Sequence, residues 1–171
     1  MLENTRRRSF GGAARSVLVL VAFVAACLVV AVVGSLITTP QTASGGWYGT
    51  LDKPFFTPPS WLFGPVWTVL YLSIAVSGWL FWRRAGFSGA KGPMALFFVQ
   101  LGLNLLWNVA FFGLQSPGLG LVEILVLWTS ILLTIIAFLR ISRPAGWILV
   151  PYLAWVTFAT ALNAGIWWLN A

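Results

Sequence analysis

Five long apolar runs dominate this chain and restrict its fold more than any other feature. A helix rises about 1.5 Å per residue, so about 20 apolar residues are needed to cross the roughly 30 Å hydrocarbon layer of a membrane. The runs are continuously apolar and lack the alternation of a barrel strand, which favours helices. We therefore predict an all-α membrane protein, a bundle of five transmembrane helices over residues 16–38, 60–82, 92–114, 118–140 and 145–168.

The scarcity of charged and ligand-type side chains excludes several classes of protein. Charged residues make up 8% of the chain, against about 25% in soluble domains, so a water-soluble fold is excluded. The chain has no histidine, and its three acidic residues, Glu3, Asp52 and Glu123, lie far apart. A zinc site, a hydrolytic triad or a paired-carboxylate centre would need other residues, and we predict no metal site.

Glu123 is the only acidic residue inside a predicted span. Carboxylates within a membrane are costly and often functional. Glu123 also lies within about two turns of a helix start, where it can reach the interface or interact with the positive helix end. Both interpretations remain open.

The basic residues predict how the chain is oriented. Nine of the ten precede the first span or fall between spans two and three or four and five, and Lys53 is the exception. By the positive-inside rule, the N-terminus is cytoplasmic and the C-terminus is outside. We predict a multi-pass protein of a bacterial cell membrane, with no nucleic-acid partner, a basic N-terminal extension over 1–15 and one domain over 16–171. The nine residues are Arg6, Arg7, Arg8, Arg15, Arg83, Arg84, Lys91, Arg140 and Arg143.

The first span has a second interpretation, because a basic start, an apolar stretch and "TAS" also occur in secretory signals. The apolar run over residues 16–37 is 22 residues long, whereas a typical signal core has about 7–15. We therefore expect this segment to remain as a transmembrane helix.

Aromatic and amide side chains recur at helical spacing in three spans. Interhelical hydrogen bonding and a pocket for a large flat ligand are both compatible with this pattern. Other tryptophans fall near span ends, where indoles favour the membrane interface. The recurring residues are Trp67 and Tyr71 in span two, Gln100, Asn104, Trp107, Asn108 and Phe111 in span three, and Tyr152, Trp155, Ala159 and Leu162 in span five.

The segment "WYGTLDKPFFTPPS" separates the first two spans and combines four aromatic residues with three prolines. Proline fixes φ and reduces the number of open conformations, so such a loop can close at a low entropic cost. We predict that the loop over 39–59 is the lid of a ligand pocket between the helices.

Four segments, "WYGTLDKPFFTPP", "VWTVLY", "QLGLNLLWNVAFF" and "PYLAWVTFATALN", occur in order between Trp47 and Asn163. Together they closely resemble the translocator protein family, the tryptophan-rich sensory proteins (TspO/MBR), also called the peripheral-type benzodiazepine receptor family. The resemblance implies a five-helix bundle whose first loop covers a pocket for porphyrins, with protoporphyrin IX or haem as ligand and no required cofactor. It also implies a homodimer. The N-terminal extension lies outside the resemblance.

The resemblance assigns roles to individual residues. Tyr48 matches the tyrosine at the pocket mouth, Asn104 an asparagine that faces the ligand, and Ala159 a small wall residue. Trp67 and Trp155 match tryptophans implicated in porphyrin chemistry, and are the catalytic residues if the protein degrades porphyrin. With the pattern above, the predicted ligand-binding set is Tyr48, Lys53, Trp67, Tyr71, Gln100, Asn104, Trp107, Asn108, Tyr152, Trp155 and Ala159, with Pro54, Pro58 and Pro59 as the frame of the lid.

Several further expectations concern the ligand and the partners. Lys53 is either a partner for a porphyrin propionate or a solvated loop charge. Because the chain has no histidine and we expect no cysteine near these motifs, a haem iron lacks an obvious axial ligand, and a metal-free porphyrin is preferred. No basic residue follows Tyr152, so the weak cholesterol pattern of animal members fails and sterol binding is doubtful. Small residues at 118–121, Gly102 and Ala95 are candidates for a dimer interface.

Three functions remain open. The first is a membrane receptor or regulator that binds porphyrins and related hydrophobic ligands. The second is an enzyme that degrades protoporphyrin with light and oxygen. The third is a transporter, which the absence of evident charged relays and internal repeats disfavours.

Overall fold

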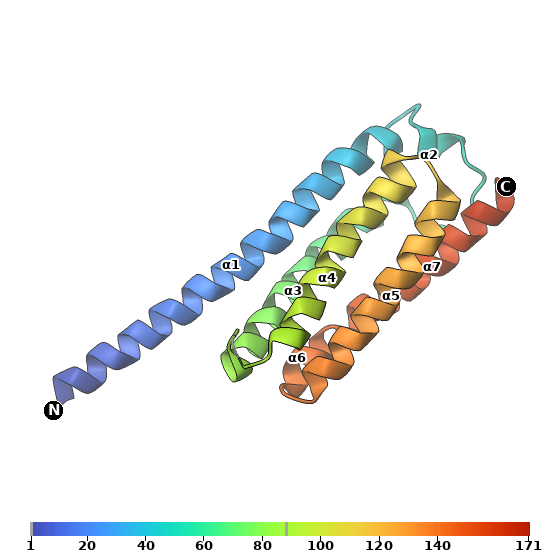
Figure 1. The fold of residues 1–171 in the computed structure, drawn as a ribbon. Coiled ribbons are helices and arrows are strands. Elements are labelled where there is room, and N and C mark those ends of the chain that lie inside the picture. Colours follow the sequence, from blue (N-terminus) through green and yellow to red (C-terminus); the bar gives the residue numbers. More distant parts are fainter. Residues whose placement is uncertain (1, 88) are drawn as a thin grey trace.

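The protein is a bundle of antiparallel helices (Figure 1). The computed structural model describes residues 2–87 and 89–171, and the side chains of those from residue 12 onward. Five helical segments are long and apolar enough to cross a membrane, as predicted, and the described residues form no strand. These segments are Gly12–Thr42, Ser60–Ala85, Lys91–Gly113, Pro117–Leu139 and Arg143–Leu169.

The first helix, α1 (Leu2–Thr42), is longer than the predicted span and contains Pro40. We expected the chain to leave the helix before this proline, and that boundary was wrong. A proline removes one backbone N–H, but the last turn keeps other bonds: the Ala43 N–H donates to the Thr39 carbonyl at 3.0 Å, and the Thr42 hydroxyl donates to the Thr38 carbonyl at 3.2 Å. The side chains of Arg6, Arg7 and Arg8 lie outside the described residues, and the division at residue 16 stays a prediction.

The predicted lid contains a short helix, α2 (Trp47–Thr50), which sequence reasoning did not expect. The segment continues to the 3-10 turn η1 (Ser60–Leu62), which leads directly into α3 (Phe63–Ala85). Figure 1 shows that α2 lies at the same end of the bundle as the C-terminus and the connection between α4 and α5. We call this the loop end.

The third span consists of α4 (Lys91–Asn108) and a wider π-helical turn, η2 (Val109–Gly113). The Leu114 N–H donates to the Val109 carbonyl at 2.8 Å and closes this turn. Phe111 and Phe112 are adjacent in sequence, yet both are buried beneath the lid. Such bulges are frequent at functional sites, and this one supplies much of the aromatic surface below α2.

The fourth span is α5 (Pro117–Leu139), and the fifth is divided into α6 (Arg143–Ile148) and α7 (Val150–Leu169). The division was not predicted. Pro151 lies in the first turn of α7, where its missing N–H costs little, and Leu149 is the junction between the two helices.

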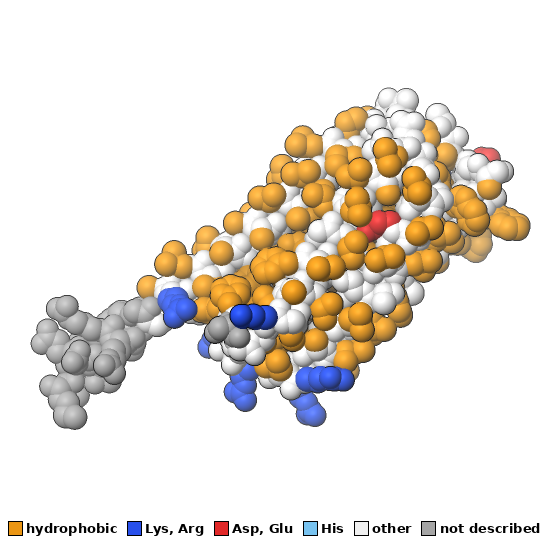
Figure 2. Space-filling model, viewed as in Figure 1, with side chains coloured by type: hydrophobic (Ala, Val, Ile, Leu, Met, Phe, Trp, Pro, Cys, Tyr) orange, Lys and Arg blue, Asp and Glu red, His pale blue; other side chains and the backbone are white. Residues whose placement is uncertain are grey.

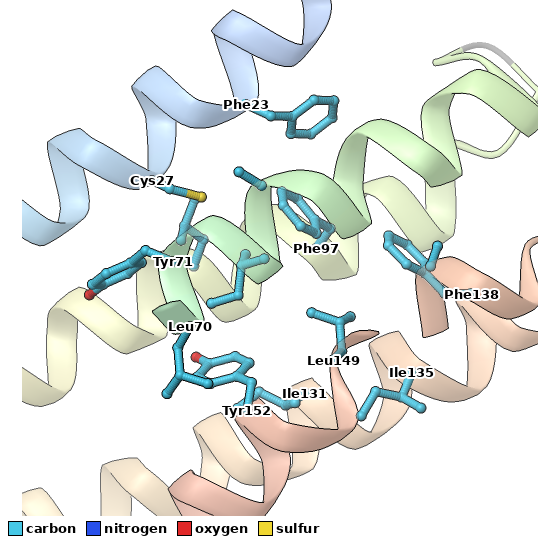
Figure 3. Packing of buried hydrophobic residues seen from close by; sticks show 14 of the residues in the cluster. Phe23, Cys27, Leu70, Tyr71, Phe97, Ile131, Ile135, Phe138, Leu149 and Tyr152 are labelled. Atoms are coloured by element: carbon cyan, nitrogen blue, oxygen red, sulfur yellow. The ribbon is translucent and has the colours of Figure 1, made fainter. Parts of the chain in front are cut away.

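The tightest aromatic packing lies toward the end of the bundle opposite the lid (Figure 3). Phe81 and Phe138 stack with ring centroids 3.9 Å apart, and Phe97 meets Phe23 edge-on at 5.4 Å. A Cβ on Gly78 would lie 2.7 Å from the Phe23 ring, so this glycine allows α1 to approach α3 closely. The helices are therefore closely packed at the end opposite the lid, and the space between them lies nearer the loop end.

Figure 2 shows blue basic side chains gathered at the end of the bundle opposite the lid, and an apolar band above them. We call this end the basic end. An acidic side chain is visible inside the apolar band. Two arginines lie over tryptophan rings at the basic end, Arg15 at 5.8 Å from Trp82 and Arg83 at 4.7 Å from Trp79. This separation of charge fits the predicted orientation, which stays a prediction.

Candidate functional site

A cavity of about 580 Å³ lies between α1, α3, η2 and α7, beneath the lid helix α2. α1 packs on α3 toward the basic end and on η2 toward the loop end. The upper parts of α1 and α3 are therefore separated, and the cavity occupies the space between them. Its volume is typical of sites for drug-sized organic ligands.

Aromatic side chains form much of the wall. Trp67 comes from α3 and Trp155 from α7, and Tyr48 comes from the lid. Trp107 stacks on Phe111 with ring centroids 5.3 Å apart, and this pair adds a further aromatic surface. A flat ligand can therefore contact rings contributed by four separate segments.

Three hydrogen-bond donors on the wall are available to a ligand. Within the described residues, the indole N–H groups of Trp67 and Trp155 and the Tyr48 hydroxyl donate no hydrogen bond, whereas the Trp107 indole donates to the Asn163 amide oxygen at 3.2 Å. Burial raises the pKa of the Tyr48 hydroxyl above its usual value, so the group stays a neutral donor at physiological pH. These donors suit a ligand that carries carboxylate or carbonyl oxygens.

The wall formed by α1 is more polar. The Thr38 hydroxyl donates to the Asn108 amide oxygen at 2.9 Å, and the Asn108 amide nitrogen donates to the Asn104 carbonyl at 2.9 Å. A Cβ on Gly34 would lie 3.3 Å from the Asn108 amide nitrogen. These contacts hold α1 against α4 and leave polar atoms on one side of an otherwise apolar cavity.

The cavity also opens sideways between α1 and α3. Leu28, Val32 and Leu72 line it and are themselves 54%, 55% and 51% exposed. All three are apolar and belong to membrane-spanning segments. A hydrophobic ligand dissolved in the bilayer therefore has a route into the cavity that does not cross the lid.

The structure places seven of the predicted ligand-binding residues on the cavity wall. Asn104 and Tyr152 lie behind the wall instead, and both are almost fully buried. The Tyr71 hydroxyl donates to the Asn104 amide oxygen at 2.6 Å, and the Asn104 amide nitrogen donates to the Tyr152 hydroxyl at 3.2 Å. Figure 3 shows the two tyrosines on different helices. The seven are Tyr48, Trp67, Tyr71, Trp107, Asn108, Trp155 and Ala159.

Gln100 does not line the cavity, although it was predicted to contact the ligand. It is 1% exposed, and neither of its amide atoms has a hydrogen-bond partner among the described residues. Glu123 and Ser130 of α5 are buried in the same way, with side-chain oxygens that lack a described partner. The amide of Gln100 therefore belongs to the packing around α4 and α5.

Lys53 and the lid prolines lie outside the cavity wall as well. The Lys53 ammonium donates to the Leu51 carbonyl at 3.0 Å and lies 4.9 Å from the centroid of the Tyr48 ring. Pro54 packs against Gly165 of α7. Lys53 thus lies at the mouth of the cavity beside Tyr48, the lid residue that forms the roof of the cavity.

Cys27 corrects one of the sequence arguments. We expected no cysteine near the motif pocket, but Cys27 of α1 lines the cavity, as Tyr71 does (Figure 3). Cys27 precedes every motif in the sequence, but α1 packs antiparallel to α3 and brings Cys27 into the cavity that the motif residues line. Because a cysteine lines the cavity, a haem iron has a possible axial ligand there, and the preference for a metal-free porphyrin loses its basis.

Sequence reasoning also missed several wall residues. Phe112 is the last residue of the motif "QLGLNLLWNVAFF" but was not assigned a role, and Phe63 lies three residues before "VWTVLY" and could have been found by extending that motif. The α1 residues Gly34 and Thr38 carry no comparable signal, because the resemblance begins only at Trp47. Their role depends on how α1 packs against α4.

The chain is similar to a known protein family and to several of its members. The model of the TspO/MBR family matches residues 23–169. A tryptophan-rich protein TspO from Archaeoglobus fulgidus is 46% identical over 156 residues, which cover 91% of this chain and 99% of the relative. The human translocator protein is 38% identical over 123 residues, 71% of this chain and 73% of the relative. A tryptophan-rich sensory protein from Cereibacter sphaeroides is 36% identical over 141 residues, 82% and 84% of the two chains. With this match along nearly all of its membrane-spanning part, the chain belongs to the TspO/MBR family.

Proposed function

We propose that this protein is a membrane receptor or regulator that binds porphyrins, protoporphyrin IX among them, in the cavity beneath α2. The observation that carries the proposal is that Trp67 and Trp155, from two different helices, line one cavity under Tyr48. All three side chains have donors that no described residue occupies. The same proposal places the protein in a bacterial cell membrane as a homodimer.

The chemistry of a porphyrin suits this cavity. Its flat macrocycle gains contact area from stacking on indole, phenol and phenyl rings. Its propionates accept hydrogen bonds from the free donors, and Lys53 at the mouth provides a nearby positive charge. The sideways opening between α1 and α3 admits a ligand that partitions into the bilayer. Haem is a second ligand of the same shape, and Cys27 on the wall is a candidate ligand for its iron.

A second candidate is light- and oxygen-dependent degradation of protoporphyrin. One contact favours it: the Trp67 ring lies 5.4 Å from the Tyr71 ring and 6.3 Å from the Tyr152 ring. An indole in contact with two hydrogen-bonded tyrosines has neighbours that can share an oxidising equivalent. In this function Trp67 and Trp155 would be the redox-active residues.

The test is a dark titration with protoporphyrin IX, in lipid nanodiscs, of wild type, Trp155→Phe and Trp168→Phe. Trp168 is the matched control, because it is 79% exposed and does not line the cavity. We expect saturable binding to wild type and to Trp168→Phe, and a Kd that is about three- to tenfold weaker for Trp155→Phe, as expected when an aromatic contact is reduced.

Non-saturable uptake that is equal in the three proteins would show partition into lipid and would contradict the proposal. Illumination of the saturated complexes in air then separates the two functions. New absorbing products from wild type, lost in both Trp67→Phe and Trp155→Phe, indicate the enzyme; saturable binding without products indicates the receptor.

A further inference from the structure

The side chain of Asn170 hydrogen-bonds the lid to the end of α7. Its amide oxygen accepts from the Asp52 backbone N–H at 3.0 Å, and its amide nitrogen donates to the Asp52 carbonyl at 2.9 Å. The same nitrogen donates to the Ile166 carbonyl at 2.7 Å. A single amide thus satisfies both backbone groups of a lid residue while it remains bonded to α7.

Two further contacts join the same stretch of the lid to α7. A Cβ on Gly165 would lie 2.5 Å from Pro54, so this position accepts only glycine while Pro54 is seated there. The Phe56 ring meets the Phe158 ring at 6.3 Å. The lid residues 52, 54 and 56 therefore follow α7 from its last turn toward its middle.

The fixed stretch adjoins the roof of the cavity. Lys53 lies between Asp52 and Pro54, and its ammonium lies 4.9 Å from the Tyr48 ring centroid. Tyr48 in turn contacts Phe112, with ring centroids 5.7 Å apart. If Asp52 leaves α7, Lys53 is no longer held beside Tyr48, and one side of the roof is lost.

We propose that Asn170 is a positioning residue that clamps the lid to α7 and thereby keeps Tyr48 over the cavity. It touches no ligand, since it does not line the cavity. Its effect is on the population of the open lid, and so on how fast a ligand enters and leaves through the mouth of the cavity; the sideways opening between α1 and α3 is a second route, which the lid does not control. The part of this inference that concerns ligand entry and exit rests on the proposed function. The part that concerns the attachment of the lid to α7 is independent of it.

The first experiment needs no ligand. Hydrogen exchange followed by mass spectrometry is compared for wild type, Asn170→Ala, Asn170→Asp and Leu169→Ala. Asn170→Asp keeps an acceptor for the Asp52 N–H but loses the two donated bonds. Leu169→Ala is the matched control, because Leu169 lies in the same turn and is 48% exposed. We expect peptides within 47–57 to exchange about tenfold faster in Asn170→Ala, which loses both bonds to Asp52, and to exchange faster by a smaller factor in Asn170→Asp, which loses one of them. They are expected to be unchanged in Leu169→Ala.

The result that overturns the clamp is lid exchange equal to wild type in Asn170→Ala, with any change confined to the last turn of α7. That pattern would mean that Asn170 only completes its own helix through Ile166. If Asn170→Ala does not fold, Asn170→Asp tests the clamp instead, because it removes the bond to the Asp52 carbonyl and keeps a side chain of the same size. Unchanged lid exchange in a folded Asn170→Asp overturns the clamp equally.

The second experiment measures the rate at which protoporphyrin IX dissociates from the same proteins in nanodiscs. We expect faster dissociation from Asn170→Ala and a smaller change in Kd, because an open lid speeds entry as well as exit. If the lid exchanges hydrogen faster but the dissociation rate is unchanged, the lid does not control how fast the ligand leaves, and that part of the proposal is overturned. Absence of saturable binding to wild type, together with faster lid exchange in the variants, supports the clamp and overturns the porphyrin assignment.

Discussion

Asn104 shows how one polar residue can organise three helices. Its amide accepts from Tyr71 of α3 and donates to Tyr152 of α7, while the residue itself belongs to α4. Inside a membrane no water is available to replace these bonds. Asn104 was expected to face the ligand directly. Instead it fixes the position of Tyr71, which lines the cavity.

We predict that Asn104→Leu lowers the stability of the protein by about 2–4 kcal/mol, because two buried tyrosine hydroxyls lose their partner. The measurement is thermal unfolding of the purified protein in detergent, with Ser73→Ala as the control. Ser73 donates only to the Val69 carbonyl of its own helix. An Asn104→Leu protein that melts with wild type would show that the tyrosines find other partners.

Gln100 leads to the opposite prediction. Its amide atoms are buried without a partner in the described part of the chain, which costs about 1–3 kcal/mol. Gln100→Met, of similar volume, removes that cost, so we expect an unchanged or higher melting temperature and an unchanged Kd for protoporphyrin IX. A weaker Kd would place Gln100 at the ligand, as the sequence pattern suggested.

At the scale of elements, one glycine of α5 sets how closely this helix approaches η2 and α7, whereas a glycine of α4 has no such role. A Cβ on Gly120 would lie 2.9 Å from the Phe111 ring and 3.0 Å from the Asn163 amide oxygen, whereas nothing lies within 4 Å of a Cβ on Gly102. The first glycine is needed where α5 meets η2 and α7. The second faces outward and is open to lipid or to a second copy of the chain.

We predict that Gly120→Ala destabilises the bundle by about 1–3 kcal/mol through overpacking, and that Gly102→Ala is neutral or stabilising because alanine is the better helix former. Melting temperatures of the two variants in detergent test this pair. Equal melting temperatures would show that the helices can separate at Gly120 without cost. A Gly102 variant that also lowers the dimer fraction would place α4 at the predicted dimer interface.

Pro40 and Pro151 show why element boundaries were only partly predictable. Pro40 follows the first predicted span, yet it lies inside the last turn of α1. Pro151 lies within the fifth predicted span, yet the helix is divided just before it, and it belongs to the first turn of α7. The outcome depends on which neighbouring carbonyls and hydroxyls complete the turn, as Thr42 does for α1. That information is local in space but is not contained in the proline itself.

At the scale of the whole molecule, charge is separated along the bundle axis (Figure 2). Asp52 and Lys53 belong to the loop end, and the other described basic side chains lie toward the opposite end, in the helices or in the short connections between them. Anionic lipid on the cytoplasmic side attracts such a basic end. The lid and the cavity mouth would then face away from the cytoplasm.

We predict that Phe87→Cys is labelled only from the cytoplasm and Ser44→Cys only from the opposite side, each in a Cys27→Ser background. Both sites are exposed and lie in connections at the two ends of the bundle. Intact cells and inverted vesicles treated with a membrane-impermeant maleimide give the answer. Labelling of Ser44→Cys from the cytoplasm would reverse the orientation.

The sequence by itself determined that five helices cross a membrane, because the free energy of placing each residue in hydrocarbon is nearly local and adds along a run. Spacing of three or four placed the motif residues on common helix faces, and the resemblance to the TspO/MBR family indicated that these faces surround a pocket. The packing of whole helices against one another decided the rest. The rotation and crossing of α1 brought Cys27 and Thr38 into the cavity wall, and the burial of one face of α4 left Gln100 outside it. Which face of a helix is buried depends on side chains that are distant in sequence but must fill the same space. No single segment therefore encodes it.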